Sequence, residues 1–256
     1  MTEQPLSDRE RVALAVTYGV VCHGVFALAG LAMLIGLFTG MQSGFGTLTG
    51  LWAWVANAAL LLQFPLGHSF FLSDRGRRVL TRLAPFGTGK TLATTTYATL
   101  ASLQLLLLFT MWSPSGVVLW VAEGAALWLF CMAYAASWVL LTKASFDAGP
   151  TVQAGSLGWV ALLRNAPPVY PDMPEQGLFR IVRQPIYVSF ALVLWCVPVW
   201  TPDQLMIAIT YTAYCIAAPR LKERRFSRYY GDRFHAYQAR VPYWLPRLTR
   251  RRAHDA

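Results

Sequence analysis

The stretch from Gly177 to Pro246 decides the fold, and it reads GLFRIVRQPIYVSFALVLWCVPVWTPDQLMIAITYTAYCIAAPRLKERRFSRYYGDRFHAYQARVPYWLP. Pro185 suits the first turn of a helix, where its missing N–H needs no intrahelical partner. An apolar run continues to Trp200 and meets Thr201-Pro202-Asp203, a turn-forming triplet. A second apolar run, 204–218, leads back to a basic segment. The stretch therefore predicts an antiparallel pair of membrane helices followed by an amphipathic tail.

The two ends of this hairpin carry opposite charges. Counted from Pro202, Arg183 lies nineteen residues before it and Glu223 twenty-one after it. Arms of about 16 residues reach roughly 24 Å, slightly less than a bilayer core. We therefore expect Arg183 and Glu223 to meet at one membrane surface.

Composition places the whole chain in the membrane. Of its 256 residues, 55% are hydrophobic and only 13% are charged, which is too apolar for an ordinary soluble domain. Each of four further runs, 12–38, 48–66, 92–112 and 117–141, is long enough to span. We expect an all-α polytopic integral membrane protein of about six transmembrane helices. Its segments are four N-terminal spans (1–142), a cytoplasmic loop (143–176), and the hairpin with its tail (177–256).

The positive charges indicate the orientation. With six spans and a cytoplasmic N-terminus, all 22 Lys and Arg fall on the inner side. None lies in the outer loops 39–47, 113–116 and 201–203. This asymmetry predicts that both termini are cytoplasmic. It also accounts for the net charge of +10 without a nucleic-acid partner. The polar start of the chain predicts that no signal peptide is removed.

Several familiar motifs are excluded by their own spacing. The segment Phe86–Thr91 reads FGTGKT, but Ala84 stands where a phosphate-binding loop needs glycine. Gly44, Gly46 and Gly50 have the wrong spacing for a dinucleotide-binding fingerprint. Four dispersed cysteines and four dispersed histidines predict no metal site and no disulfide framework.

The hairpin stretch resembles the isoprenylcysteine carboxyl methyltransferase superfamily over about 70 of 256 residues. The residues that carry the resemblance are Gly177, Phe179, Val182-Arg183-Gln184-Pro185-Ile186-Tyr187, Glu223-Arg224, Tyr230-Gly231-Asp232-Arg233-Phe234, Tyr237, Val241-Pro242 and Pro246. The chain departs from the pattern at two positions. Gln184 stands where histidine is usual, so a proton-transfer role there is in doubt. Lys222 stands where a second acid is frequent.

The resemblance implies S-adenosylmethionine as cofactor, bound beside the hairpin at the cytoplasmic side. A guanidinium binds a carboxylate through two hydrogen bonds, so Arg183 is the candidate for the cofactor carboxylate. Glu223 is the candidate acceptor for the ribose hydroxyls and the ammonium group, and these two residues are the candidate catalytic pair. The remaining cofactor-binding candidates are Gln184, Pro185, Tyr187, Tyr230 and Tyr237.

A second, weaker resemblance extends into the N-terminal half. Gln63 followed by His68-Ser69 and a basic loop is similar to bacterial methanethiol S-methyltransferases and NnrU-type proteins. It makes His68 and Ser69 candidate substrate residues, against the equal alternative of a polar helix end. The implied reaction is methylation of a small or lipophilic acceptor, most simply a thiol, in the bacterial inner membrane and in contact with its lipids.

Other classes stay open at this point. The same hairpin occurs in membrane reductases that use NADPH, and NnrU-type relatives include a haem-dependent isomerase, for which His23 and His68 are the candidate ligands. For His23 alone we favour a buried histidine bonded to a neighbouring helix. Glu123 is expected inside the fourth span in a structural role. The short run 157–164 is expected to form an interfacial helix or a lid over the cytoplasmic cavity.

Overall fold

The fold is built almost entirely from helices. A computed structural model describes residues 6–247. Its helices are α1 (Asp8–Phe38), α2 (Gly50–Phe71), α3 (Asp74–Leu83), α4 (Gly89–Met111), α5 (Gly124–Asp147), α6 (Pro150–Gln153), α7 (Ser156–Leu163), η1 (Gly177–Arg180), α8 (Pro185–Trp195), α9 (Pro202–Tyr230) and α10 (Asp232–Arg240). Two short strands, β1 (Trp120–Val121) and β2 (Val199–Trp200), pair antiparallel.

Four of these helices, α1, α2, α4 and α5, are long and apolar enough to cross a membrane. Their outer faces carry exposed hydrophobic side chains such as Trp128 at 75% exposure and Leu51 at 74%. Water would not tolerate such a surface, whereas lipid favours it. The chain is thus an all-α polytopic integral membrane protein, as predicted.

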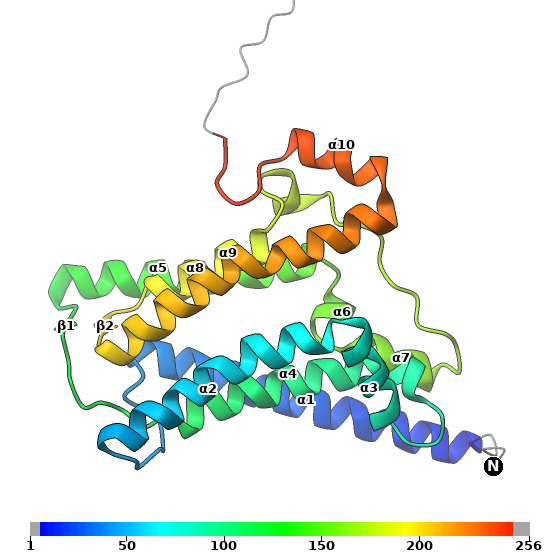
Figure 1. The fold of residues 1–256 in the computed structure, drawn as a ribbon, viewed down its shortest axis with the longest axis horizontal. Helices are drawn as coiled ribbons and strands as arrows, with labels where there is room; N and C mark the ends of the chain where they lie inside the picture. The colour runs from blue at the N-terminus through cyan, green and yellow to red at the C-terminus, as the bar shows by residue number, and fades with distance from the viewer. Residues whose placement is uncertain (1–5, 248–256) are drawn as a thin grey trace, which may run out of the picture.

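The helices form two layers (Figure 1). The helices α1, α2 and α4 make one layer, and α5, α8 and α9 make the other. Within the layers, α1 packs on α4 and α5 packs on α8. The loops before α2, α5 and α9 gather at one end, while the N-terminus, α3, α7 and α10 lie at the other. This arrangement agrees with the alternation expected from the distribution of positive charge.

Both helices of the hairpin differ in length from the expected ones. The first helix ends at Trp195, because the chain that follows is extended and enters β2 after Pro198. The second helix passes through Pro219 and continues to Tyr230. A proline inside a helix disrupts the bonding of the preceding turn. Here the hydroxyl of Tyr243 donates to the carbonyl of Ile216 over 2.8 Å, one residue after the Cys215 carbonyl that loses its donor at Pro219.

The expected position of Glu123 inside a span is wrong. Residues 120–121 are held in the β1–β2 pair, so α5 begins only at Gly124, which has a φ of +53°. Glu123 is the exposed residue that precedes this helix. The fourth span therefore contains no carboxylate near its outer end.

The expected bonding of His23 to a neighbouring helix is confirmed. The indole of Trp159 donates to His23 Nε2 over 3.1 Å, so His23 is bonded to a neighbouring helix. The four cysteines are free. The short run forms α7, which packs on α1 and α4. None of its residues lines the cavity described below, so it is no lid there.

Candidate active site

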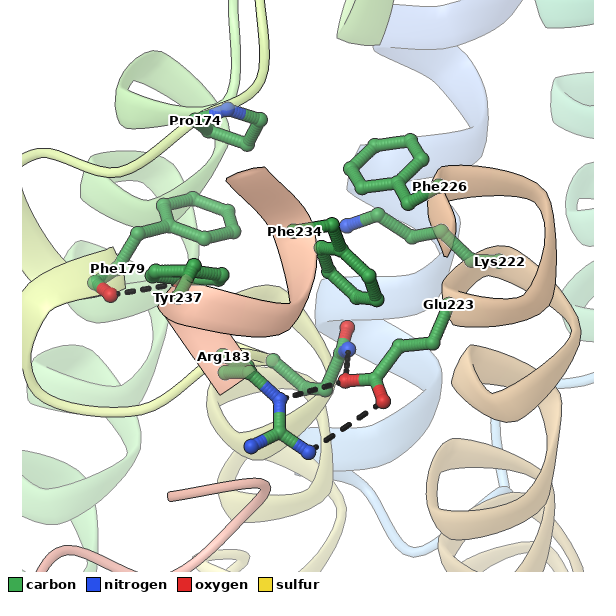
Figure 2. Close-up of a pocket in the computed structure, with 9 residues that line it drawn as sticks. Pro174, Phe179, Arg183, Lys222, Glu223, Phe226, Phe234 and Tyr237 are labelled. Carbon is green, nitrogen blue, oxygen red and sulfur yellow. Dashed lines mark hydrogen bonds and ion pairs between the residues drawn. The ribbon is translucent and has the colours of Figure 1, made fainter. Parts of the chain in front are cut away.

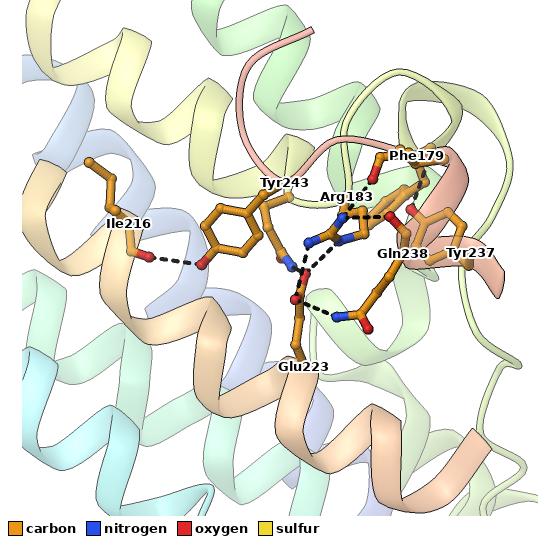
Figure 3. A network of polar contacts seen from close by, with 9 residues as sticks. Phe179, Arg183, Ile216, Glu223, Tyr237, Gln238 and Tyr243 are labelled. Carbon is orange, nitrogen blue, oxygen red and sulfur yellow. Dashed lines mark hydrogen bonds and ion pairs between the residues drawn. The ribbon is translucent and has the colours of Figure 1, made fainter. Parts of the chain in front are cut away.

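The chain segment before α8 and the C-terminal part of α9 (219–230) together position a buried ion pair. Arg183 Nε donates to Glu223 Oε1 over 2.8 Å, and its terminal nitrogen donates to Oε2 over 3.3 Å (Figure 3). The two side chains are only 13% and 12% exposed. The expected meeting of these residues at one end of the hairpin is thus confirmed.

Two amides complete the shell around the Glu223 carboxylate. Gln184 Nε2 donates to Oε1 over 2.8 Å, and Gln238 Nε2 donates to Oε2 over 3.0 Å. With the two bonds from Arg183, this carboxylate accepts four hydrogen bonds. A carboxylate has about four acceptor positions, so Glu223 is saturated.

The same arginine anchors the C-terminal tail. Its second terminal nitrogen donates to the carbonyls of Gln238 at 3.1 Å and Val241 at 2.6 Å. The Arg183 backbone N–H donates to the Pro242 carbonyl over 2.9 Å. Its guanidinium also lies 5.5 Å from the ring centre of Tyr243. The Val241-Pro242 motif of the sequence is thus the segment that closes over the ion pair.

A small cavity with about 10 Å³ of free space lies beside the ion pair (Figure 2). Its lining residues are Pro174, Phe179, Arg183, Gln184, Lys222, Glu223, Phe226, Phe234 and Tyr237. Lys222 extends between the rings of Phe226 and Phe234. Its Nζ lies 5.5 Å from the ring centre of Phe179 and 5.2 Å from that of Phe226. The cavity therefore combines charged groups at its base with aromatic walls.

Helix α10 covers this cavity and is tied down by exposed ion pairs. Arg233 contacts Asp172 at 2.6 Å and Glu175 at 2.8 Å, and Arg240 contacts Glu175 at 3.4 Å. Hydrogen bonds from Arg233 lower the pKa of Asp172 below its usual value. The break before α10 falls at Gly231, whose φ is +52°. Exposed pairs of this kind are weak, so these three contribute little to holding α10 in place.

Four of the seven cofactor-binding candidates line the cavity, namely Arg183, Gln184, Glu223 and Tyr237. The Tyr237 hydroxyl donates to the Phe179 carbonyl over 2.8 Å, which fixes the ring in the wall. The other three, Pro185, Tyr187 and Tyr230, do not line it. Pro185 begins α8, and Tyr230 packs against Phe226.

The candidate substrate residues lie outside the cavity lining, at the end of α2. His68 is bonded to the Tyr97 hydroxyl, with 2.7 Å to its Nε2. Ser69 Oγ lies 3.2 Å from the Tyr214 hydroxyl on α9. The structure thus places both residues in polar contacts between helices, one of them with the hairpin.

Sequence reasoning missed three participants. Lys222 was noted only as a departure from a motif, while Gln238 and Pro174 carried no signal of their own. Lys222 directly precedes Glu223 on a helix whose neighbouring turn contributes Phe226. That spacing of three to four residues was the available indication that Lys222 and Phe226 share a face.

Burial between aromatic rings lowers the pKa of Lys222 to about 8. An unfolded lysine has a pKa of about 10.4, so the unfolded state binds more protons between these values. This lysine therefore destabilises the fold fully below pH 8, and the cost disappears as the pH rises towards about 10. Smaller contributions to the pKa of Lys222 come from the charge of Glu223, which raises it, and from that of Arg225, which lowers it.

We expect Lys222→Met to unfold at a higher temperature than the wild type below pH 8. The difference in melting temperature should narrow between pH 8 and about 10, measured by tryptophan fluorescence in detergent. Other titrating groups are common to both proteins and cancel. A difference that is constant with pH would contradict the lowered pKa.

Comparisons with known proteins find relatives of this chain among named methyltransferases. Methanethiol S-methyltransferase 1 of Bradyrhizobium diazoefficiens is 29% identical over 91% of this chain and 82% of its own length. Methanethiol S-methyltransferase of a Pseudomonas species is 27% identical over 90% and 89%, respectively. Nurim of Xenopus laevis is 31% identical over 48% of this chain and 46% of its own length. No family model matches the chain. No solved structure matches it.

These matches confirm the resemblance to bacterial membrane methyltransferases. Those two matches cover about nine-tenths of this chain, far more than the hairpin stretch. Since relatives named as methyltransferases need a methyl donor and act on a small molecule, the site is expected to accommodate both.

Proposed function

We propose that this chain is a membrane methyltransferase that transfers a methyl group from S-adenosylmethionine to the sulfur of a small thiol. The observation that carries the proposal is the convergence of the hairpin motif. Arg183, Gln184, Glu223 and Tyr237 come from distant segments and line one cavity. The names of the relatives support a thiol as the acceptor and methanethiol as the first one to test.

The cavity is closed in this structure and is much smaller than the cofactor. Complete ligand pockets usually measure about 300–1000 Å³, whereas this cavity has about 10 Å³ of free space, the room of roughly one water molecule. Gln184 is 2% exposed, and its Oε1 has no hydrogen-bond partner among the described residues, as expected of a group that awaits a ligand donor. Binding of the cofactor therefore requires α10 to move, which its weak exposed ion pairs permit.

When bound, S-adenosylmethionine supplies an electrophilic methyl carbon on a sulfonium. The acceptor thiol loses its proton to solvent, its sulfur forms the new carbon–sulfur bond, and the old bond breaks to leave a thioether. The protein then contributes mainly position and exclusion of water. Aromatic walls from Phe179, Phe226 and Phe234 favour a sulfonium and keep water out.

The acceptor and its route are consistent with a membrane setting. A small volatile thiol partitions into an apolar protein and its surrounding lipid, so no polar entry channel is required. The distribution of Lys and Arg supports a bacterial inner membrane location with both termini and the cavity on the cytoplasmic side. We propose no nucleic-acid partner.

The test is isotopic. Membranes containing the chain are incubated with methanethiol and S-adenosylmethionine carrying a fully deuterated methyl group, and the headspace is analysed by mass spectrometry. We expect dimethyl sulfide three mass units heavier than the unlabelled product, above membranes that lack the chain. Arg228→Met changes an exposed residue outside the cavity and should keep this activity.

Absence of labelled product in a folded protein would contradict thiol methylation. Binding of NADPH instead of S-adenosylmethionine would then favour a reductase, and a haem Soret band would favour an isomerase. Methylation of a longer-chain thiol but not methanethiol would keep the reaction and change the acceptor.

A further inference from the structure

Two polar groups in the cavity have no polar partner among residues 6–247. One is the Nζ of Lys222, which makes no hydrogen bond or ion pair there and touches only aromatic faces. The other is Gln184 Oε1, a buried acceptor without a donor. A buried acceptor without a donor is costly unless a ligand or a water completes it, and the cation without a counter-charge lies in the same cavity lining.

Arg183 is not available for this purpose. A guanidinium has five N–H donors. Arg183 uses two towards Glu223 and two towards the carbonyls of Gln238 and Val241. A bidentate grip on a ligand carboxylate would require it to leave Glu223 buried without its counter-charge, which is costly.

Glu223 is equally committed. All of its acceptor positions are taken by Arg183, Gln184 and Gln238. A ligand ammonium would have to displace one of these donors. The unpaired Oε1 of Gln184 offers an acceptor that displaces nothing.

We propose that Lys222 and Gln184 form the subsite for the amino-acid end of the methyl donor. Lys222 Nζ binds the α-carboxylate, and Gln184 Oε1 accepts a hydrogen bond from the α-ammonium. The Arg183–Glu223 pair is a positioning unit that orients Gln184 through its Nε2. This inference rests on the proposed function, and it gives Lys222 the contact that the sequence alone assigned to Arg183.

The chemistry of the cavity supports this assignment. An α-amino acid presents a carboxylate and an ammonium about one carbon apart, and both a cation and an acceptor line this cavity. The aromatic rings of Phe179, Phe226 and Phe234 exclude water, which strengthens an ion pair formed among them. A ligand carboxylate would also supply the counter-charge that the Lys222 ammonium lacks among the described residues.

The experiment compares two ligands by calorimetry on the full-length protein in detergent. One ligand is S-adenosylmethionine, and the other is its decarboxylated form, which lacks only the carboxylate. We expect Lys222→Met to weaken S-adenosylmethionine at least tenfold and the decarboxylated ligand less than twofold. Lys222→Arg keeps the charge and should retain most of the preference for the carboxylate. The exposed Arg228→Met is the matched control.

A second pair of ligands tests the ammonium contact. For wild type, S-adenosylmethionine should bind several-fold more tightly than an analogue without the α-amino group. Gln184→Met should reduce that ratio towards one. The ratio of the two affinities is taken within each protein, so a loss of affinity caused by a disturbed Glu223 affects both ligands and cancels. Only loss of the contact between Gln184 and the ammonium changes the ratio.

The outcomes distinguish the two proposals. Wild type that binds neither ligand would overturn the methyltransferase function itself. Wild type that binds S-adenosylmethionine while Lys222→Met weakens both ligands equally would overturn the carboxylate contact alone. An unchanged amino-group ratio in Gln184→Met would overturn the ammonium contact. Melting curves of each variant establish that it is folded before binding is measured.

Discussion

Glu223→Ala is expected to lower the free energy of unfolding by about 3–5 kcal/mol, as breaking a buried ion pair from one side does. The change leaves Arg183 as an uncompensated charge that is 13% exposed. It also removes the acceptor for the side-chain amides of Gln184 and Gln238. Methyl transfer should be lost with it, because Gln184 is no longer oriented.

The measurement is chemical or thermal unfolding in detergent beside two controls. Glu175→Ala removes a partner of exposed arginines on α10, and it should cost about 1 kcal/mol or less. Glu223→Gln keeps the shape and removes the charge, and it should fall between the two. A loss for Glu223→Ala no larger than that for Glu175→Ala would show that the pair contributes little to the fold.

The second large effect is expected for Arg183→Lys, although the charge is conserved. An ammonium cannot reproduce the planar fork that holds both Glu223 oxygens and two tail carbonyls. At least two charge-assisted hydrogen bonds are lost, each worth about 1.5–3 kcal/mol. The carbonyls of Gln238 and Val241 then lose their anchor, so the segment 232–243 should detach from α9.

Hydrogen exchange observed by mass spectrometry will report this detachment. Amides of 232–243 should exchange at least tenfold faster in Arg183→Lys than in wild type, while the spans α1 and α4 stay protected. Arg180→Lys is the matched control, because Arg180 is exposed and lies three residues earlier. Equal protection of the tail in all three proteins would mean that packing of Phe234 and Tyr237, not Arg183, holds α10.

Motion of α10 connects these variants to function. The helix closes a cavity that is smaller than the cofactor, so a cycle of opening and closing is expected in each turnover. Its contacts divide into a strong set at Arg183 and a weak set at Arg233 and Arg240. The weak ion pairs lie on the exposed side of α10. The helix can therefore open on that side while the bonds from Arg183 keep its C-terminal end in place.

The sequence by itself determined the membrane class and the meeting of Arg183 with Glu223, and it predicts the orientation. These follow from the lengths of apolar runs, from charge asymmetry and from a hairpin centred on Pro202, all of which depend on spacing along the chain. The structure confirmed the class and the ion pair. Four of the seven cofactor-binding candidates from the sequence motif line the one cavity beside the ion pair.

Only the tertiary structure decided how these groups are partnered. Glu123 lies outside its expected span because β1 pairs with β2, a strand far away in the sequence. Arg183 is saturated by carbonyls of the tail, and Lys222 is left unpaired among rings from η1, α9 and α10. Hydrogen-bond saturation and burial depend on which distant segments meet. Spacing along the chain identifies charged residues, whereas three-dimensional packing determines which of them is free to bind a ligand.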